Sequence, residues 1–83
     1  MLRIISANLN GIRSAANKGF YQWLSNQNAD FVCLQELKAQ AADLTAQMLN
    51  PDGLHGYFHY AEKKGYSGVG IYSKTPADAV IEG

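Results

Sequence analysis

The segment Phe31-Val-Cys-Leu-Gln-Glu-Leu-Lys38 decides the fold that this sequence predicts, because it joins an apolar run directly to charged residues. Residues 31–35 form a run of the length and composition that is typical of a β-strand buried on both faces. Glu36 follows at the carboxyl end of that strand, where open α/β sheets bind their ligands. A carboxylate held there suits a hard cation such as Mg²⁺, whereas the alternative is an ordinary solvated glutamate at a strand exit.

The composition indicates one small globular domain. Its 83 residues are 47% hydrophobic and 17% charged, which excludes a disordered chain. The formal net charge is zero, so any nucleic-acid site has to be a local feature. Cys33 is the single cysteine, and the absence of an internal disulfide fits a reducing cytoplasm. The sequence shows neither a signal peptide nor a membrane-spanning stretch.

The N-terminal half predicts a strand, a helix and a second strand. Residues 2–7 are rich in β-branched and aliphatic residues, which favours the first strand. Apolar residues then recur at helical spacing and predict a helix over about residues 18–28, before the strand at 31–35. This order predicts a right-handed crossover between two parallel neighbouring strands. Such a crossover would bring Asn8 and Glu36 to the same edge of the sheet.

The C-terminal half predicts one more helix and further strands. The helix is expected over residues 41–49, and Asn50-Pro-Asp-Gly53 would end it. Strands are expected at 57–61, at 69–73 and beginning at 79–81.

Two patterns in this half carry alternative interpretations. His55 and His59 have a spacing that suits a metal on a helix, but their aromatic surroundings favour a strand and argue against such a site. The segment Glu62-Lys-Lys-Gly-Tyr-Ser-Gly68 combines lysines, glycines and a tyrosine. That composition suits contacts to phosphate groups and an ordinary hairpin loop equally well.

Three segments in a fixed order resemble the exonuclease III type of apurinic/apyrimidinic (AP) endonuclease, a branch of the exonuclease–endonuclease–phosphatase superfamily. They are Ser6-Ala-Asn-Leu-Asn-Gly-Ile-Arg13, Cys33-Leu-Gln-Glu-Leu-Lys38 and Lys64-Gly-Tyr-Ser-Gly-Val-Gly-Ile-Tyr-Ser73. The resemblance implies an α/β (α+β) fold that is part of a four-layered α/β sandwich. Residues 1–83 would then form the N-terminal part of an incomplete endonuclease/exonuclease/phosphatase domain.

The resemblance also implies roles for individual residues. Glu36 matches the acidic ligand of a catalytic Mg²⁺, for which Mn²⁺ is an alternative. Asn8 matches the asparagine that orients this carboxylate, so both residues are candidates for catalysis and for the metal site. Asn10 matches a further neighbour of the metal, and Leu37 replaces the usual threonine, which affects local packing only. The positions that match contacts to the DNA backbone are Arg13, Lys18, Lys38, Lys64, Gly65 and Tyr66.

The implied activity is metal-dependent hydrolysis of double-stranded DNA on the 5′ side of an abasic site, with an associated 3′–5′ exonuclease activity. The cysteine usage favours a cytoplasmic protein, and we expect a monomer at full length. The family segments Gly-Asp-Phe-Asn and Ser-Asp-His, which supply the general base and a His-Asp pair, do not occur in the 83 residues. We therefore expect the chain alone to be inactive.

Two alternatives to a DNA-repair nuclease stay open. One is another phosphodiesterase or phosphatase of the superfamily, acting on inositol phosphates, sphingomyelin or RNA. The other is a non-catalytic module that binds DNA or a protein partner. The matches at Arg13, Gly65 and Tyr66 favour the DNA-repair branch over the other superfamily enzymes, and the non-catalytic module stays open.

Overall fold

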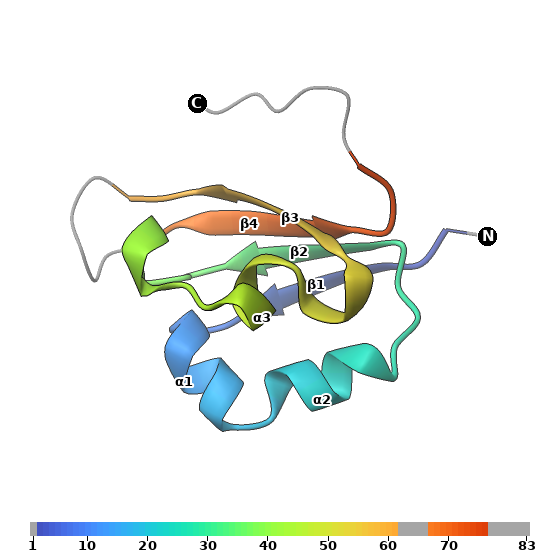
Figure 1. Cartoon of the computed structure of the whole chain (residues 1–83), viewed down its shortest axis with the longest axis horizontal. Coiled ribbons are helices and arrows are strands. Elements are labelled where there is room, and N and C mark those ends of the chain that lie inside the picture. Colours follow the sequence, from blue (N-terminus) through green and yellow to red (C-terminus); the bar gives the residue numbers. More distant parts are fainter. Residues whose placement is uncertain (1, 62–66, 77–83) are drawn as a thin grey trace.

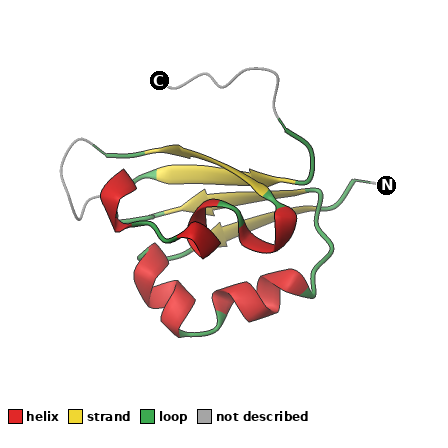
Figure 2. Ribbon diagram, viewed as in Figure 1, coloured by secondary structure: helices red, strands yellow, loops and turns green. Residues whose placement is uncertain are grey.

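The computed structural model describes residues 2–61 and 67–76, which form a mixed α/β fold around one sheet (Figure 1, Figure 2). Its strands are paired in the order β1-β2-β4-β3. The strands span Ile4–Asn8 (β1), Phe31–Gln35 (β2), His55–His59 (β3) and Val69–Ser73 (β4). β1 and β2 are parallel neighbours, as predicted, and β4 runs antiparallel to both β2 and β3.

All strands that were predicted within the described residues are present, but the bounds of two of them differ from the prediction. β2 and β4 have the predicted bounds, and β1 is shifted toward the C-terminus. β3 begins at His55 instead of Tyr57, because its pairing with β4 runs from His55 opposite Ser73 to His59 opposite Val69. Both histidines therefore lie on a strand, as expected. The strand predicted at 79–81 lies outside the described residues.

Short helices cover one face of the sheet (Figure 1). They are α1 (Ile12–Asn17), α2 (Phe20–Ser25) and α3 (Ala46–Leu49), together with the 3-10 turns η1 (Ala41–Asp43) and η2 (Pro51–Gly53). No helix within residues 2–61 and 67–76 has the length and hydrophobicity needed to cross a membrane.

Both predicted helices are wrong in their bounds. The helical region predicted over about residues 18–28 begins earlier, at Ile12, and is divided into α1 and α2 at Gly19. Gly19 has a φ of 92°, a left-handed conformation that interrupts the helix between them. The second is divided because Leu44 and Thr45 are extended. The Thr45 hydroxyl then accepts a hydrogen bond from the Met48 amide and caps α3.

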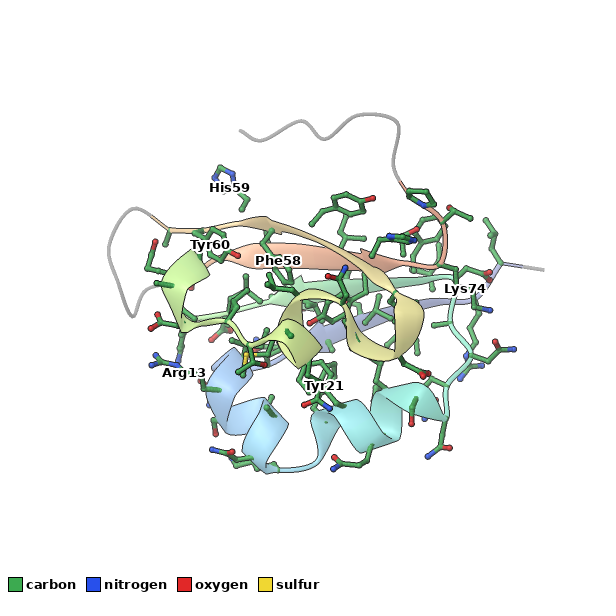
Figure 3. All side chains as sticks on the ribbon, in the orientation of Figure 1. Arg13, Tyr21, Phe58, His59, Tyr60 and Lys74 are labelled. Carbon is green, nitrogen blue, oxygen red and sulfur yellow. The ribbon has the colours of Figure 1, made fainter. Side chains whose placement is uncertain are left out.

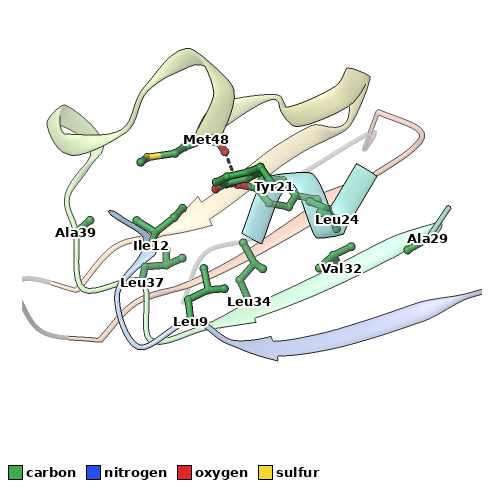
Figure 4. Close-up of a cluster of buried hydrophobic side chains, with 11 residues drawn as sticks. Leu9, Ile12, Tyr21, Leu24, Ala29, Val32, Leu34, Leu37, Ala39 and Met48 are labelled. Atoms are coloured by element: carbon green, nitrogen blue, oxygen red, sulfur yellow. Dashed lines mark hydrogen bonds between the residues drawn. The ribbon is translucent and has the colours of Figure 1, made fainter. Parts of the chain in front are cut away.

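The hydrophobic core lies between the sheet and the helices (Figure 4). β2 contributes Val32 and Leu34, which are almost completely buried, whereas Phe31 is only partly buried. In the described part of the chain this strand is therefore buried on one face, and burial on both faces stays a prediction for a protein that includes a second sheet. Only the face toward the helices is buried, and on the other face Ile4 and Ile71 are 62% and 44% exposed.

A buried pair of tyrosines links the layers of the fold. The hydroxyl groups of Tyr21 on α2 and Tyr72 on β4 lie 2.8 Å apart, and the Tyr72 hydroxyl donates to the carbonyl oxygen of Met48 on α3. Burial raises the pKa of both phenols above the ordinary value of 10.0, and for Tyr72 the hydrogen bond to Tyr21 raises it further. The pair therefore stays neutral and hydrogen-bonded at physiological pH.

Candidate functional site

The candidate site lies at the carboxyl ends of the two parallel strands. Asn8 is the last residue of β1, and Glu36 follows β2 directly. The Asn8 side-chain amide donates a hydrogen bond to Oε2 of Glu36. The predicted meeting of these two residues at one edge of the sheet is confirmed, because parallel pairing places both strand ends side by side.

The Asn8 amide is held in one orientation by two contacts. Its nitrogen faces the Glu36 carboxylate, while its oxygen accepts a hydrogen bond from the Asn10 backbone amide at 3.0 Å. Asn10 and Gly11 both have positive φ values, of 47° and 105°, so the chain turns sharply here. Asn8 therefore stabilises the turn and orients the carboxylate at the same time.

The backbone around Glu36 adopts a conformation that is uncommon for residues other than glycine. Glu36 and Lys38 have φ values of 55° and 52°. Leu37 between them is fully buried, and its backbone amide donates to the Gly68 carbonyl oxygen at 3.1 Å. The Glu36 carbonyl oxygen accepts from the Gly11 amide at 2.8 Å. Such left-handed residues persist only where surrounding contacts hold them, and they are concentrated at functional sites.

The Lys38 side chain completes a ring of polar contacts. Its ammonium group donates to Oδ1 of Asn10 at 2.6 Å and lies 3.8 Å from Oε1 of Glu36. Both charged side chains are partly exposed, so the ion pair itself contributes little stability. The ring brings one carboxylate, two amides and one cation together at an edge of the sheet.

These residues fit a part of a magnesium site. Glu36 offers a partly exposed carboxylate, and Mg²⁺ is commonly bound by one or two carboxylates together with water and substrate phosphate. Within residues 2–61 and 67–76, no three His, Cys, Asp or Glu side chains lie close enough to hold a metal by themselves. Direct ligation by Asn8 stays a prediction, since its amide oxygen accepts the Asn10 backbone amide and its contact to Glu36 is made by the amide nitrogen.

The structure brings some of the predicted DNA-binding residues to this site. Lys38 belongs to it, and Arg13, in the first turn of α1 (Figure 3), donates to the Lys38 carbonyl oxygen at 3.3 Å. Lys18 is exposed after the last residue of α1, about 9 Å along the helix from its start. Lys64, Gly65 and Tyr66 lie outside the described residues.

Two residues next to the site, Asp43 and Gln40, are not among those predicted from the sequence. Asp43 lies 3.9 Å from the Arg13 guanidinium, and its carboxylate accepts the Gln40 backbone amide at 2.9 Å. Gln40 donates through its side chain to the Ala61 carbonyl oxygen at 2.6 Å. The three-residue spacing of Gln40 and Asp43 is that of a capping box, which is the one pattern that could have marked this segment.

Comparison with known proteins shows what the chain is similar to. It matches the model of the Endonuclease/Exonuclease/phosphatase family over residues 5–83. An exodeoxyribonuclease of Bacillus subtilis (strain 168) is 41% identical over 83 residues, which are 99% of this chain and 32% of that protein. A DNA-(apurinic or apyrimidinic site) endonuclease of Dictyostelium discoideum is 33% identical over 82 residues, which are 99% of this chain and 22% of that protein.

Solved structures show the same similarity. An AP endonuclease from Archaeoglobus fulgidus superposes with a TM-score of 0.79 and 33% identity, covering 94% of this chain and 30% of that one. A 3′-5′ exonuclease from Neisseria meningitidis superposes with a TM-score of 0.70 and 28% identity, covering 86% of this chain and 27% of that one. The chain thus spans about a third, or less, of the length of these relatives.

Proposed function

Because the chain belongs to the Endonuclease/Exonuclease/phosphatase family, we propose that it supplies part of a DNA-repair nuclease. The observation that carries the proposal is the contact between Asn8 and Glu36 at the ends of two parallel strands. The names of the relatives, an exodeoxyribonuclease and an AP endonuclease, support DNA as the substrate. The proposed reaction is hydrolysis of the DNA backbone 5′ to an abasic site, with 3′–5′ exonuclease activity.

Glu36 is the residue that would hold Mg²⁺ or Mn²⁺, and Asn8 would keep its carboxylate directed toward the metal. The bound metal would supply charge neutralisation at the reacting phosphate. Asn8 would do this through its amide nitrogen, which donates to Glu36, while the hydrogen bond from the Asn10 backbone to its oxygen keeps the amide in this orientation. The Lys38 ammonium adds a positive charge next to the carboxylate, where a phosphate group of DNA would lie.

Local cations would bind the DNA backbone, because the chain as a whole has no net charge. Lys38 and Arg13 lie at the site, and Lys18 is exposed directly after the last residue of α1. Lys64, Gly65 and Tyr66 stay part of the proposal. The support for them is that Gly68, which belongs to the same matched segment and is described, accepts a hydrogen bond from the Leu37 amide next to Glu36.

The steps that need a general base and a His-Asp pair are assigned to no residue of this chain. His55 and His59 lie on β3, at the opposite edge of the sheet from β1, and neither is assigned to these steps. The protein that performs the complete reaction therefore requires groups beyond those that these 83 residues supply. At full length we propose a cytoplasmic monomer.

The test of this function is the replacement of Glu36 by glutamine in the protein as the cell makes it. Glutamine keeps the size and removes the charge that would bind the metal. Cleavage of duplex DNA with one synthetic abasic site in Mg²⁺ should fall at least about a hundredfold, since even the partners of a metal ligand commonly contribute ten- to a hundredfold. Asp52→Asn is the matched control, because it removes one exposed carboxylate from η2.

Cleavage within a few-fold of the wild-type rate at saturating Mg²⁺ would show that Glu36 is not the ligand. Parallel assays with an inositol phosphate, sphingomyelin and RNA test the other superfamily activities. A wild-type protein that binds the duplex without cleaving any of these substrates would instead be a binding module.

A further inference from the structure

Arg13 connects two parts of the segment that follows Glu36. Its Nη2 atom donates to the Lys38 carbonyl oxygen at 3.3 Å, and its Nη1 atom lies 3.9 Å from Oδ1 of Asp43. The two side chains differ in burial, since that of Arg13 is 51% exposed and that of Asp43 is 14% exposed. Asp43 is therefore the fixed end of the pair, and it limits where the arginine can lie.

Asp43 is itself held in place by η1. Its Oδ2 atom accepts the Gln40 backbone amide at 2.9 Å, and its own amide donates to the Gln40 carbonyl oxygen at 2.8 Å. A largely buried carboxylate requires a cationic or hydrogen-bonding partner, and Arg13 supplies the cation here. The guanidinium can contact both partners because its donors form a planar fork.

The contact to the Lys38 carbonyl oxygen matters because Lys38 has an uncommon backbone conformation, with a φ of 52°. Turning this peptide would change the direction in which the Lys38 side chain leaves the backbone. That side chain reaches Asn10 at 2.6 Å and the Glu36 carboxylate at 3.8 Å. The orientation of the Lys38 peptide therefore determines whether the ring of polar contacts at the site can form.

We propose that Arg13 and Asp43 are a positioning pair that holds Lys38, and through it Glu36, in the geometry of the site. The consequence for catalysis rests on the proposed function, whereas the pair itself rests on the contacts above. This role differs from a contact between Arg13 and the DNA backbone. The two roles make opposite predictions for Asp43.

Neutralising Asp43 separates the two roles. If Arg13 acts only on phosphate, Asp43→Asn frees the guanidinium and removes a negative charge near DNA, so DNA affinity should rise. If the pair positions the segment, Asp43→Asn and Arg13→Lys should both lower the rate of cleavage. Asparagine keeps the size of the side chain and an oxygen that can accept the Gln40 amide, so η1 is retained.

The experiment measures kcat and KM for duplex DNA with an abasic site, in the protein as the cell makes it. Arg13→Lys and Asp43→Asn should each lower kcat about three- to tenfold with little change in KM, as expected for a partly exposed pair that acts through its neighbours. The double variant should be no slower than the slower single variant, because both changes break the same contact. Asp52→Asn, which also removes one carboxylate, should keep the wild-type kcat.

Hydrogen exchange provides a readout that does not depend on nuclease activity. The amides of Gly11 and Ile12 donate to the carbonyl oxygens of Glu36 and Leu37 at 2.8 Å each. Both amides should exchange faster in Arg13→Lys and Asp43→Asn than in the wild type or in Asp52→Asn. This result would support the pair even if the protein cleaved no DNA, in which case only the proposed function would fail.

Unchanged exchange at Gly11 and Ile12, or an Asp43→Asn variant with tighter DNA binding and wild-type kcat, would overturn the proposal. If Asp43→Asn does not fold, the exchange of these two amides in Arg13→Lys decides the question alone. Lysine retains a positive charge that can bind phosphate but lacks the planar set of donors of a guanidinium group. Wild-type kcat and wild-type amide exchange in Arg13→Lys would therefore also overturn the proposal.

Discussion

At the scale of the residue, Tyr72 has a role in stability that Tyr21 only partly shares. The Tyr72 hydroxyl is hydrogen-bonded to both the Met48 carbonyl oxygen and the Tyr21 hydroxyl, whereas the Tyr21 hydroxyl is hydrogen-bonded only to Tyr72 within the described residues. Tyr72→Phe leaves two buried polar groups without this partner and should lower the free energy of unfolding by about 1–3 kcal/mol. Tyr21→Phe is the matched control and should cost less, because the bond from Tyr72 to Met48 remains.

Urea unfolding of both variants measures this difference, and its pH dependence adds a second check. The folded-state pKa of each phenol is raised above the unfolded value of 10.0. The neutral pair therefore stabilises the fold fully below about pH 10, and this contribution declines as the pH rises above that value. Tyr72→Phe should show a shallower loss of stability above pH 10 than the wild type. An equal cost for both variants would contradict the assigned role of Tyr72.

Single residues differ in how far the sequence could predict them. Asn8 and Glu36 could be placed together because each follows a recognisable strand, and parallel strands end at the same edge. The contact between Arg13 and Asp43 could not, since it joins residues thirty positions apart through a long side chain without any periodic pattern. The left-handed φ of Glu36 and Lys38 could not be predicted either, because neither residue type favours that conformation.

At the scale of the element, the strands followed from the sequence better than the helices. The apolar run and its flanking polar residues define β2 and β4, because strand pairing buries every second side chain on the helix-facing side. The helix bounds were missed at Gly19 and Thr45. Gly19 interrupts the helix by its left-handed backbone, and Thr45 starts a new helix by capping it. The helical spacing of apolar residues continues across both positions, so that spacing alone does not reveal the interruptions.

The segment that joins β3 to β4 leads to a prediction about DNA binding. Its described ends, Ala61 and Gly68, are hydrogen-bonded to Gln40 and Leu37, next to the site. Lys63 and Lys64 lie between them, outside the described residues. Replacing both lysines by alanine should weaken DNA binding and reduce the slope of log affinity against log salt by about 0.9 for each phosphate that a lysine no longer neutralises.

The control for this prediction is Lys74→Ala. Figure 3 shows Lys74 at the opposite end of the sheet from Arg13, and its ammonium group contacts Asn28 at 2.7 Å. Its replacement should leave the salt slope unchanged. A salt titration of binding to two unrelated duplex sequences measures the effect, which should be equal for both because backbone contacts carry no base information. An unchanged slope for the double lysine variant would favour an ordinary surface loop.

At the scale of the whole molecule, the sheet has two different faces. The face toward the helices holds the core, including Val32 and Leu34. On the opposite face Ile4, Val69 and Ile71 are 62%, 50% and 44% exposed in the described part of the chain. Val69 and Ile71 are two residues apart on β4, and Ile4 lies on the same face of β1 beyond β2. Large apolar side chains exposed together on one face of a sheet are typical of a surface that another element covers. In a four-layered sandwich a second sheet would cover this face.

We therefore expect the 83-residue chain by itself to associate or to remain molten, and to have no nuclease activity in Mg²⁺. Replacing Ile71 by lysine provides a test with opposite outcomes. In the 83-residue chain the charge should reduce association, because Ile71 is exposed there. In a protein of the relatives' length it should lower the free energy of unfolding by several kcal/mol, since it would bury an unpaired charge between two sheets. Light scattering and urea unfolding measure the two effects. A monomeric 83-residue chain with a sharp, cooperative thermal transition would contradict this expectation and favour a free-standing binding module.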